Sequence, residues 1–456
     1  MKRHEISWKP VLLLSAILLG AVASLATATA EPANKYKSRP KGSVTYNKDI
    51  APLIYQNCTV CHREGEVAPF TLATYNDIKK RAKQIVAVTQ KGIMPPWHAE
   101  AGFGEFSNAR FLTPEQRGLM EQWMLDGMPV GKASDLPPKP TYPKGWTIGT
   151  PDLVVEPEQE FTVSATGDDI FQCFVIPTNY SEDRYIRSVE VRPGSAAVVH
   201  HVLAFLDTTG QARKLDTADP SYGYSSYGGI GFMPSGVVAG WAPGNDPYKL
   251  PEGLGVLLPK GADIVLQVHY HKTGKVEKDR TRVGLSFQKK PVDKRIRTAM
   301  VINPFFRIPA GAEAHEVKAG TRLPGNVTLL SVTPHMHLLG REMTLVAKKP
   351  SGEKIPLVRV PNWNYKWQTT YDFKTPISVP QDTRIELVAK YDNSTKNPLN
   401  PSSPPKAVSW GEQTTDEMCI AFVSYTVDDE HLTKGVEASG YPEFGGGRRS
   451  RARLRR

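Results

Sequence analysis

The chain has 456 residues, of which 40% are hydrophobic and 23% are charged. This length predicts two or three domains, and the composition excludes wholesale disorder. The formal net charge is +11, but residues 1–30 carry +2 and the arginines after residue 447 carry +6, which leaves +3 for the body. So small an excess predicts no nucleic-acid-binding groove. Four cysteines are too few for a disulfide scaffold.

The N-terminus has the pattern of a secretory signal at residues 1–30. A short basic segment precedes the apolar run 11–26, and Ala28-Thr29-Ala30 offers the small residues that a signal peptidase needs. We expect cleavage before Glu31, no transmembrane anchor in the mature chain, and a periplasmic or secreted bacterial protein. The alternative is an uncleaved anchor, although the apolar run is shorter than a membrane span.

Helical patterns come next. Apolar residues recur at helical spacing over 50–54 and 78–86, and residues 113–116 read Thr-Pro-Glu-Gln, an N-cap with a first-turn proline and a capping-box glutamine. We expect a small all-α domain at 40–131, followed by a proline-rich linker at 132–152.

Short β-type runs separated by Pro and Gly turns begin after the linker. They predict two all-β sandwich domains, at 153–295 and 296–432. Residues 186–191 and 197–206, on either side of Pro193-Gly194-Ser195, are typical of a hairpin. A basic tail at 433–456 would be either a solvated extension or a contact with an anionic lipid or cell-wall polymer.

Residues 58–62 read Cys-Thr-Val-Cys-His, the attachment pattern of haem c. Cys58 and Cys61 would form thioethers with the haem vinyl groups, and His62 would bind the iron. One alternative is a redox disulfide, which would not require His62. The other is half of a zinc site, which would require a second cysteine pair nearby.

The sixth haem ligand is expected to be Met94, which lies between two predicted helices. A methionine ligand would raise the reduction potential and suit electron transfer. Met120, Met124 and Met128 are alternatives, but their spacing is more typical of core packing. Residues 46–131 resemble the helical cytochrome c modules that are fused to exported bacterial enzymes.

Three histidine pairs lie on β-type segments beyond the linker. They are His200 with His201, His269 with His271, and His335 with His337. Two histidines separated by one residue share a face of a strand, whereas adjacent ones do so only at a bulge or a strand end. Imidazole ligands without thiolate suit copper or zinc, and a nearby redox haem favours copper. The spacing alone does not show how the six histidines divide between metal ions.

Four segments that include these histidines occur in a recognisable order, at 198–203, 266–270, 334–341 and 416–419. They resemble segments of the copper type II, ascorbate-dependent monooxygenases, the family of peptidylglycine α-hydroxylating monooxygenase and dopamine β-monooxygenase. The resemblance implies two jelly-roll β-sandwiches that face each other across a solvent-filled gap. The complete expectation is therefore a small all-α cytochrome c domain followed by two all-β jelly-roll sandwich domains.

The resemblance also implies two copper ions per chain and their ligands. The electron-storing copper would be held by His200, His201 and His269. The copper at which O2 and substrate react would be held by His335, His337 and Met418. His271 would then not be a ligand.

The chain departs from the animal enzymes of this family in its cysteines. Those enzymes carry several disulfides in this region, whereas this chain has only Cys173 and Cys419 outside the haem motif. The two could form a bridge across the sandwiches or remain free thiols. The family's substrate-recognition residues have no clear match here, so the substrate could be a small molecule or a peptide.

These observations predict an exported copper-dependent monooxygenase that hydroxylates a C–H bond with O2. Haem c would relay electrons to the copper sites from an external donor, with ascorbate or another reductant as a further source. The alternative is a non-enzymatic periplasmic haem–copper electron-transfer or copper-binding protein. A zinc hydrolase is disfavoured because no convincing general base accompanies the histidine pairs.

Overall fold

The structure is a computed structural model that describes residues 36–64, 66, 68–142, 145–227, 229–438 and 440–441. The expected signal at 1–30 and the six arginines of the tail lie outside the described residues. Within the described part of the chain, none of the helices combines the length and the apolar character needed to cross a membrane.

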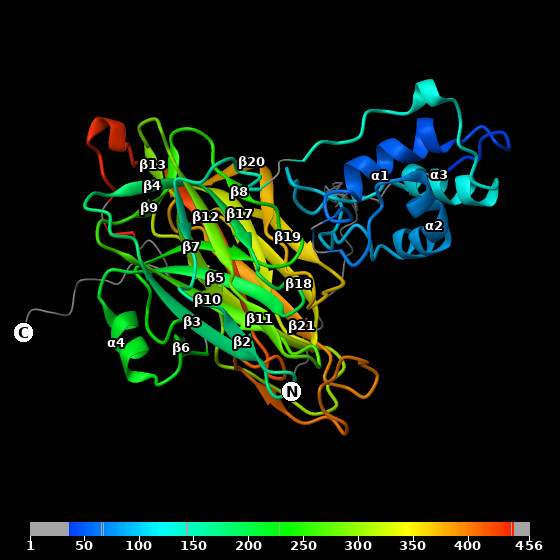
Figure 1. The fold of residues 1–456 in the computed structure, drawn as a ribbon. Coiled ribbons are helices and arrows are strands. Elements are labelled where there is room, and N and C mark those ends of the chain that lie inside the picture. The colour runs from blue at the N-terminus through cyan, green and yellow to red at the C-terminus, as the bar shows by residue number, and fades with distance from the viewer. Residues whose placement is uncertain are drawn as a thin grey trace, which may run out of the picture.

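The N-terminal helices gather at one side of a β-rich body (Figure 1). They are η1 Tyr46–Ile50, α1 Ala51–Asn57, α2 Tyr75–Gln90, α3 Pro114–Leu125 and the 3-10 turn η2 Ala133–Asp135. Their apolar faces enclose a small core that includes Ile54, Ile78 and Trp123. The predicted cap of α3 is confirmed, because the Thr113 hydroxyl accepts from the Gln116 N–H at 3.2 Å and the Gln116 side chain accepts from the Thr113 N–H at 2.8 Å.

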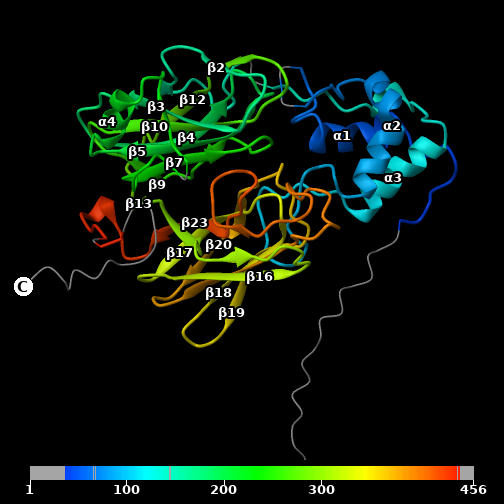
Figure 2. The ribbon, with the colours of Figure 1, turned by 90° about the horizontal axis from the view of Figure 1, so that it is seen from below.

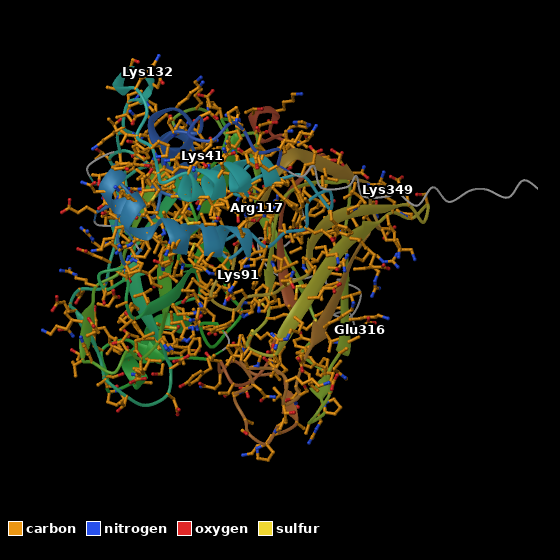
Figure 3. All side chains as sticks on the ribbon, turned by 90° about the vertical axis from the view of Figure 1, so that its right-hand side faces the viewer. Lys41, Lys91, Arg117, Lys132, Glu316 and Lys349 are labelled. Carbon is orange, nitrogen blue, oxygen red and sulfur yellow. The ribbon has the colours of Figure 1, made fainter. Side chains whose placement is uncertain are left out.

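The segment between α2 and α3 packs against the β body. Trp97 packs edge-on against Tyr371, with ring centroids 5.1 Å apart, and Phe106 forms a β-bridge with Phe373. Ala99 belongs to the hydrophobic core of the β region. The segment between α2 and α3, which was expected to belong to an all-α domain, therefore packs in a non-helical conformation on β20 (Tyr371–Val379). Figure 3 looks onto the helical part, where Lys41, Lys91, Arg117 and Lys132 come from separate segments.

Two larger sheets form the first half of the β body (Figure 2). The six-stranded sheet contains β1 Leu153–Val155, β12 Arg282–Phe287, β4 Arg184–Arg192, β9 Leu254–Leu258 and β13 Lys294–Arg295, with β8 Tyr248–Lys249 beside β4. The five-stranded sheet contains β6 Tyr224–Ser225, β3 Ile170–Pro177, β10 Asp263–Tyr270, β5 Val199–Asp207 and β7 Gly236–Trp241. A small pair, β2 Phe161–Val163 and β11 Glu277–Asp279, and the helix α4 Gln211–Ala218 accompany them. One apolar core draws side chains from both large sheets.

Two four-stranded sheets form the second half. One contains β14 Arg297–Ile302, β23 Ile420–Val427, β17 Val327–His335 and β20. The other contains β16 His315–Arg322, β21 Arg384–Tyr391, β18 Gly340–Lys348 and β19 Lys354–Val360. A short pair, β15 Arg307–Ile308 and β22 Val408–Ser409, and the 3-10 turn η3 Leu432–Lys434 complete this half. Alternating apolar residues of β17, β18, β21 and β23 face a common core.

The expected fold class is wrong. The described chain is mostly β, with four short α-helices, and the small sheets have a four-bladed, propeller-like arrangement instead of two jelly rolls. The helices before residue 131 do not make a sizeable all-α cytochrome c domain. The physical reason is that helical periodicity accounts for only part of that span, while Trp97 and Phe106 are partly buried against β20.

The expected hairpin around Gly194 is also wrong. β4 and β5 belong to different sheets, because β4 pairs with β12 and β9 whereas β5 pairs with β10 and β7. The turn between β4 and β5 is bound to the end of β11, because the N–H of Ser195 donates to the Asp279 carboxylate at 2.9 Å.

Candidate metal centre

Three histidines of the five-stranded sheet converge in space. His269 on β10 is directly opposite His201 on β5, and the pairing then shifts so that Tyr270 is opposite Val199. His200 is therefore the extra residue of a β-bulge, which lets two adjacent histidines approach the same point. Of the two arrangements that would let adjacent histidines share a ligand site, a bulge or a strand end, the structure has the bulge. One nitrogen from each imidazole lies within 4.8 Å of the others.

The nitrogens that converge in this first cluster are the Nδ1 atoms. His201 Nδ1 lies 3.3 Å from both His200 Nδ1 and His269 Nδ1. On the other side of its ring, His269 donates from Nε2 to the Asp169 carboxylate at 2.9 Å. This hydrogen bond fixes the His269 tautomer and leaves its Nδ1 lone pair directed at the cluster.

The second cluster contains His335, the last residue of β17, and His337. Met336 between them is fully buried in the core, so the two imidazoles lie on the opposite face. Their Nε2 atoms are 3.3 Å apart. Each ring is held through Nδ1, since His335 donates to the Gln368 side-chain oxygen at 2.7 Å and His337 donates to the Asp416 carbonyl at 3.2 Å. Two Nε2 lone pairs therefore face each other.

Met418 lies at the same end of this sheet. It comes two residues before Ile420, which is the β23 partner of His335, and only 9% of it is exposed. Its carbonyl accepts from the Tyr391 hydroxyl at 2.7 Å. The structure thus places Met418 near the second cluster, and its role as a ligand stays a prediction.

Glu417, which is fully buried, holds the backbone of the second cluster. Its carboxylate accepts from the N–H groups of His337 at 2.9 Å, Leu339 at 2.6 Å and Met418 at 3.2 Å. One side chain therefore fixes the position of two predicted ligands. Burial raises the pKa of Glu417, and the backbone N–H groups that donate to its carboxylate oppose this rise.

Tyr365 lies between the two clusters. Its ring stacks on His200 with centroids 4.7 Å apart and planes at 17°, and it meets His337 edge-on at 6.0 Å. Its hydroxyl lies 2.9 Å from the Thr414 hydroxyl. The expectation of a solvent-filled gap belongs to the rejected jelly-roll arrangement, and at this point an aromatic ring fills the space between the histidines.

The histidines are neutral near pH 7. Burial lowers the pKa of His200 to about 3 and that of His335 to about 4, and it holds the pKa of His201 and of His337 well below the ordinary value. Neighbouring imidazoles add to the effect at His200, His201 and His337. Neutral imidazole is the form that binds a metal ion, so these sites need not release a proton before they bind.

The predicted haem-binding residues lie at the C-terminal end of α1. The N–H groups of Cys61 and His62 both donate to the Cys58 carbonyl, at 3.2 and 2.8 Å, so the motif forms a single turn. Both cysteines are free thiols. His62 donates from Nδ1 to the Phe70 carbonyl at 3.0 Å, which leaves Nε2 available to a ligand.

The candidates for the sixth haem ligand differ in their surroundings. Met94 is half-buried just after α2, whereas Met120 is 2% exposed and belongs to the core of the helical part. Met124 and Met128 pack against that same core. Met120, Met124 and Met128 therefore have a packing role, and the role of Met94 stays a prediction.

Cys173 and Cys419 are both buried free thiols. They belong to separate hydrophobic cores, one beneath α4 and one between the four-stranded sheets. His271 is exposed and lies 3.2 Å from the Asp169 carboxylate, outside the group of three converging imidazoles.

Sequence analysis does not predict five of the residues that contact these clusters, which are Asp169, Tyr365, Gln368, Thr414 and Glu417. Only Glu417 could have been found from the sequence, because it belongs to the recognised Asp-Glu-Met-Cys segment at 416–419. The other four contact the clusters through loops that no periodicity describes.

Residues 298–438 match the family described as copper type II ascorbate-dependent monooxygenase, C-terminal domain. DBH-like monooxygenase protein 2 of mouse is 21% identical over 253 residues, which cover 50% of this chain and 38% of that protein. The chain therefore spans less than half the length of this relative.

Solved structures resemble the chain only distantly. A VP2 subviral particle of infectious bursal disease virus has a TM-score of 0.18 at 9% identity and covers 61% of this chain and 72% of its own. PNGF-II has a TM-score of 0.25 at 10% identity, with coverages of 61% and 66%. Structural similarities with TM-scores this low give no evidence about the fold or the function of this chain. The sequence matches therefore relate residues 298–438 to the C-terminal domain of the copper type II, ascorbate-dependent monooxygenases, and half of the chain distantly to one monooxygenase-like protein.

Proposed function

We propose that the protein is an exported copper-dependent monooxygenase that hydroxylates a C–H bond of a small molecule or peptide with O2. The observation that carries the proposal is the convergence of imidazole lone pairs at two neighbouring clusters, one of three histidines and one of two. Neutral imidazoles suit copper, and the thioether of Met418 beside the second cluster suits Cu(I). When bound, copper supplies the one-electron chemistry with O2 that side chains lack.

The chain's own residues orient the ligands and limit the access of water. Asp169 fixes His269, Gln368 fixes His335, and the Asp416 carbonyl fixes His337. Such partners on the outer nitrogen of a ligating histidine determine its tautomer and ring orientation. Tyr365 covers the face of the His200 imidazole and meets the His337 ring edge-on, which limits the access of water between the clusters.

The proposal includes a covalent haem c at Cys58, Cys61 and His62 that relays electrons to the copper sites. Its support is the sequence motif, the two free thiols in one turn and the free Nε2 of His62. Met94 would be the sixth ligand. An external donor to the haem, or ascorbate, would then be the reductant.

The test is metal analysis of the purified protein followed by oxygen-uptake assays on a panel of C–H substrates. Two coppers and one haem per chain with substrate-dependent O2 uptake are expected. Copper without uptake on any substrate would favour a haem–copper carrier. Stoichiometric zinc in place of copper would overturn the proposal, and a missing haem absorption band would remove only the relay.

A further inference from the structure

A single polar chain connects the first histidine cluster to the second half of the protein. Asp169, immediately before β3, accepts from His269 Nε2 at 2.9 Å and from the Thr414 hydroxyl at 2.7 Å, both at its Oδ2 atom. Thr414 lies 245 residues further along the chain, in the loop that leads to Asp416 and Met418. The first cluster is therefore supported by a residue from the region of the second.

The direction of these hydrogen bonds follows from their chemistry. The Asp169 carboxylate only accepts, so the Thr414 hydroxyl must donate to it. The Thr414 oxygen is then free to accept, and the Tyr365 hydroxyl, 2.9 Å away, donates to it. The chain runs from Tyr365 through Thr414 to Asp169, which His269 also reaches.

Thr414 is well placed to control the geometry of Asp169. The Asp169 side chain is 13% exposed, and its other oxygen, Oδ1, lies 3.2 Å from Nδ1 of the exposed His271. The hydrogen bond from Thr414 therefore determines where Oδ2 lies, and Oδ2 is the atom that orients His269. Partners of this kind change metal affinity by about 10- to 100-fold when they are removed.

We infer that Thr414 is a positioning residue for the three-histidine cluster, which it supports through Asp169 from the other half of the chain. This inference rests on the proposed function, because it assumes that the cluster binds copper. It makes the first site dependent on the same loop that presents Asp416, Glu417 and Met418 to the second site.

The test uses the full-length chain with His335→Ala and His337→Ala, so that copper can bind with full affinity only at the three-histidine cluster. Cu(II) affinity is measured by competition with a chelator, and the ligand field by electron paramagnetic resonance. Thr414→Val should weaken binding by about tenfold or more and shift the copper hyperfine splitting. Thr414→Ser retains the hydroxyl and should restore both values.

Two controls separate positioning from folding. Thr433→Val removes a threonine-to-carboxylate hydrogen bond to Asp293, outside both clusters, and should leave copper binding unchanged. In an Asp169→Asn background, Thr414→Val should have little further effect. Unchanged affinity and an unchanged spectrum in Thr414→Val would overturn the inference. If the parent chain with His335→Ala and His337→Ala binds no copper, the proposed function is overturned together with the inference.

Discussion

The Tyr365 ring lies almost parallel to the His200 imidazole, with centroids 4.7 Å apart and planes at 17°. The same ring meets His337 edge-on at 6.0 Å. A single side chain from the second half of the chain therefore touches one histidine of each cluster. The two clusters are neighbours in one site, and their geometry depends on how the two halves pack.

We predict that Tyr365→Leu weakens copper binding at the three-histidine cluster by up to about tenfold. An aromatic pair contributes about 0.5–1.5 kcal/mol beyond the area it buries, and about 1.4 kcal/mol corresponds to a factor of ten. Competitive copper titration measures the effect. Tyr365→Phe keeps the stacked ring and should lose much less affinity. Equal losses in the two variants would show that the stack has no role.

Met418→Ile should abolish substrate hydroxylation while the three-histidine copper is retained. Isoleucine is similar in size but has no thioether, so the second cluster keeps only its two imidazoles. Copper content should fall from two toward one per chain, and oxygen uptake should stop. Met300→Ile, at a half-buried position of β14, is the matched control. Full activity in Met418→Ile would exclude Met418 as a ligand.

Sequence analysis found the elements that local rules determine. The capping box at Thr113 and Gln116 follows from the chemistry of a few adjacent residues. The bulge at His200 does not, because it arises from the pairing of β5 with β10. The contacts that build the site are of another kind. Thr414 reaches Asp169 across 245 residues, and an isolated threonine in a loop has no pattern that predicts its partner.

The wrong expectations about the fold have the same cause, which is that they were based on local sequence patterns. The turn at Gly194 resembles a hairpin locally, but β5 pairs with β10 and β7, which lie far from it in the sequence. Trp97 lies in a span with helical patterns on both sides, yet its ring packs edge-on against Tyr371. Periodicity predicts which face of an element is apolar, but not which surface will cover it.

We predict that Glu417→Gln destabilises the protein by about 1–3 kcal/mol, the cost of leaving a buried donor without its acceptor. The amide can accept with one oxygen, but its NH2 group would face backbone N–H donors that the carboxylate now satisfies. Thermal unfolding of the copper-free protein measures this loss. Glu386→Gln, at a half-buried position of β21, should change the melting temperature little. Equal shifts in both variants would refute a special role for Glu417.

The buried ion pairs of Glu430 predict a loss of stability in acid. This carboxylate is fully buried and binds Arg295 at 2.6 Å and Arg297 at 2.9 Å. Burial alone would raise its pKa, but the two arginines outweigh that effect and lower the pKa to about 2. Because the folded pKa lies below the ordinary value of about 4.3, the stabilisation is present above about pH 4 and is lost as the pH falls toward 2.

Glu430→Gln should therefore cost about 3–5 kcal/mol at neutral pH, because it removes the buried counterion that Arg295 and Arg297 share. The variant should also lose the part of the acid-induced destabilisation that Glu430 causes between pH 4 and 2. Glu437 provides the control, since it pairs with the same Arg295 at 2.8 Å but is 65% exposed. Glu437→Gln should cost less than about 1 kcal/mol. Urea unfolding at several pH values measures both variants, and similar losses would mean that burial does not strengthen the Glu430 pairs.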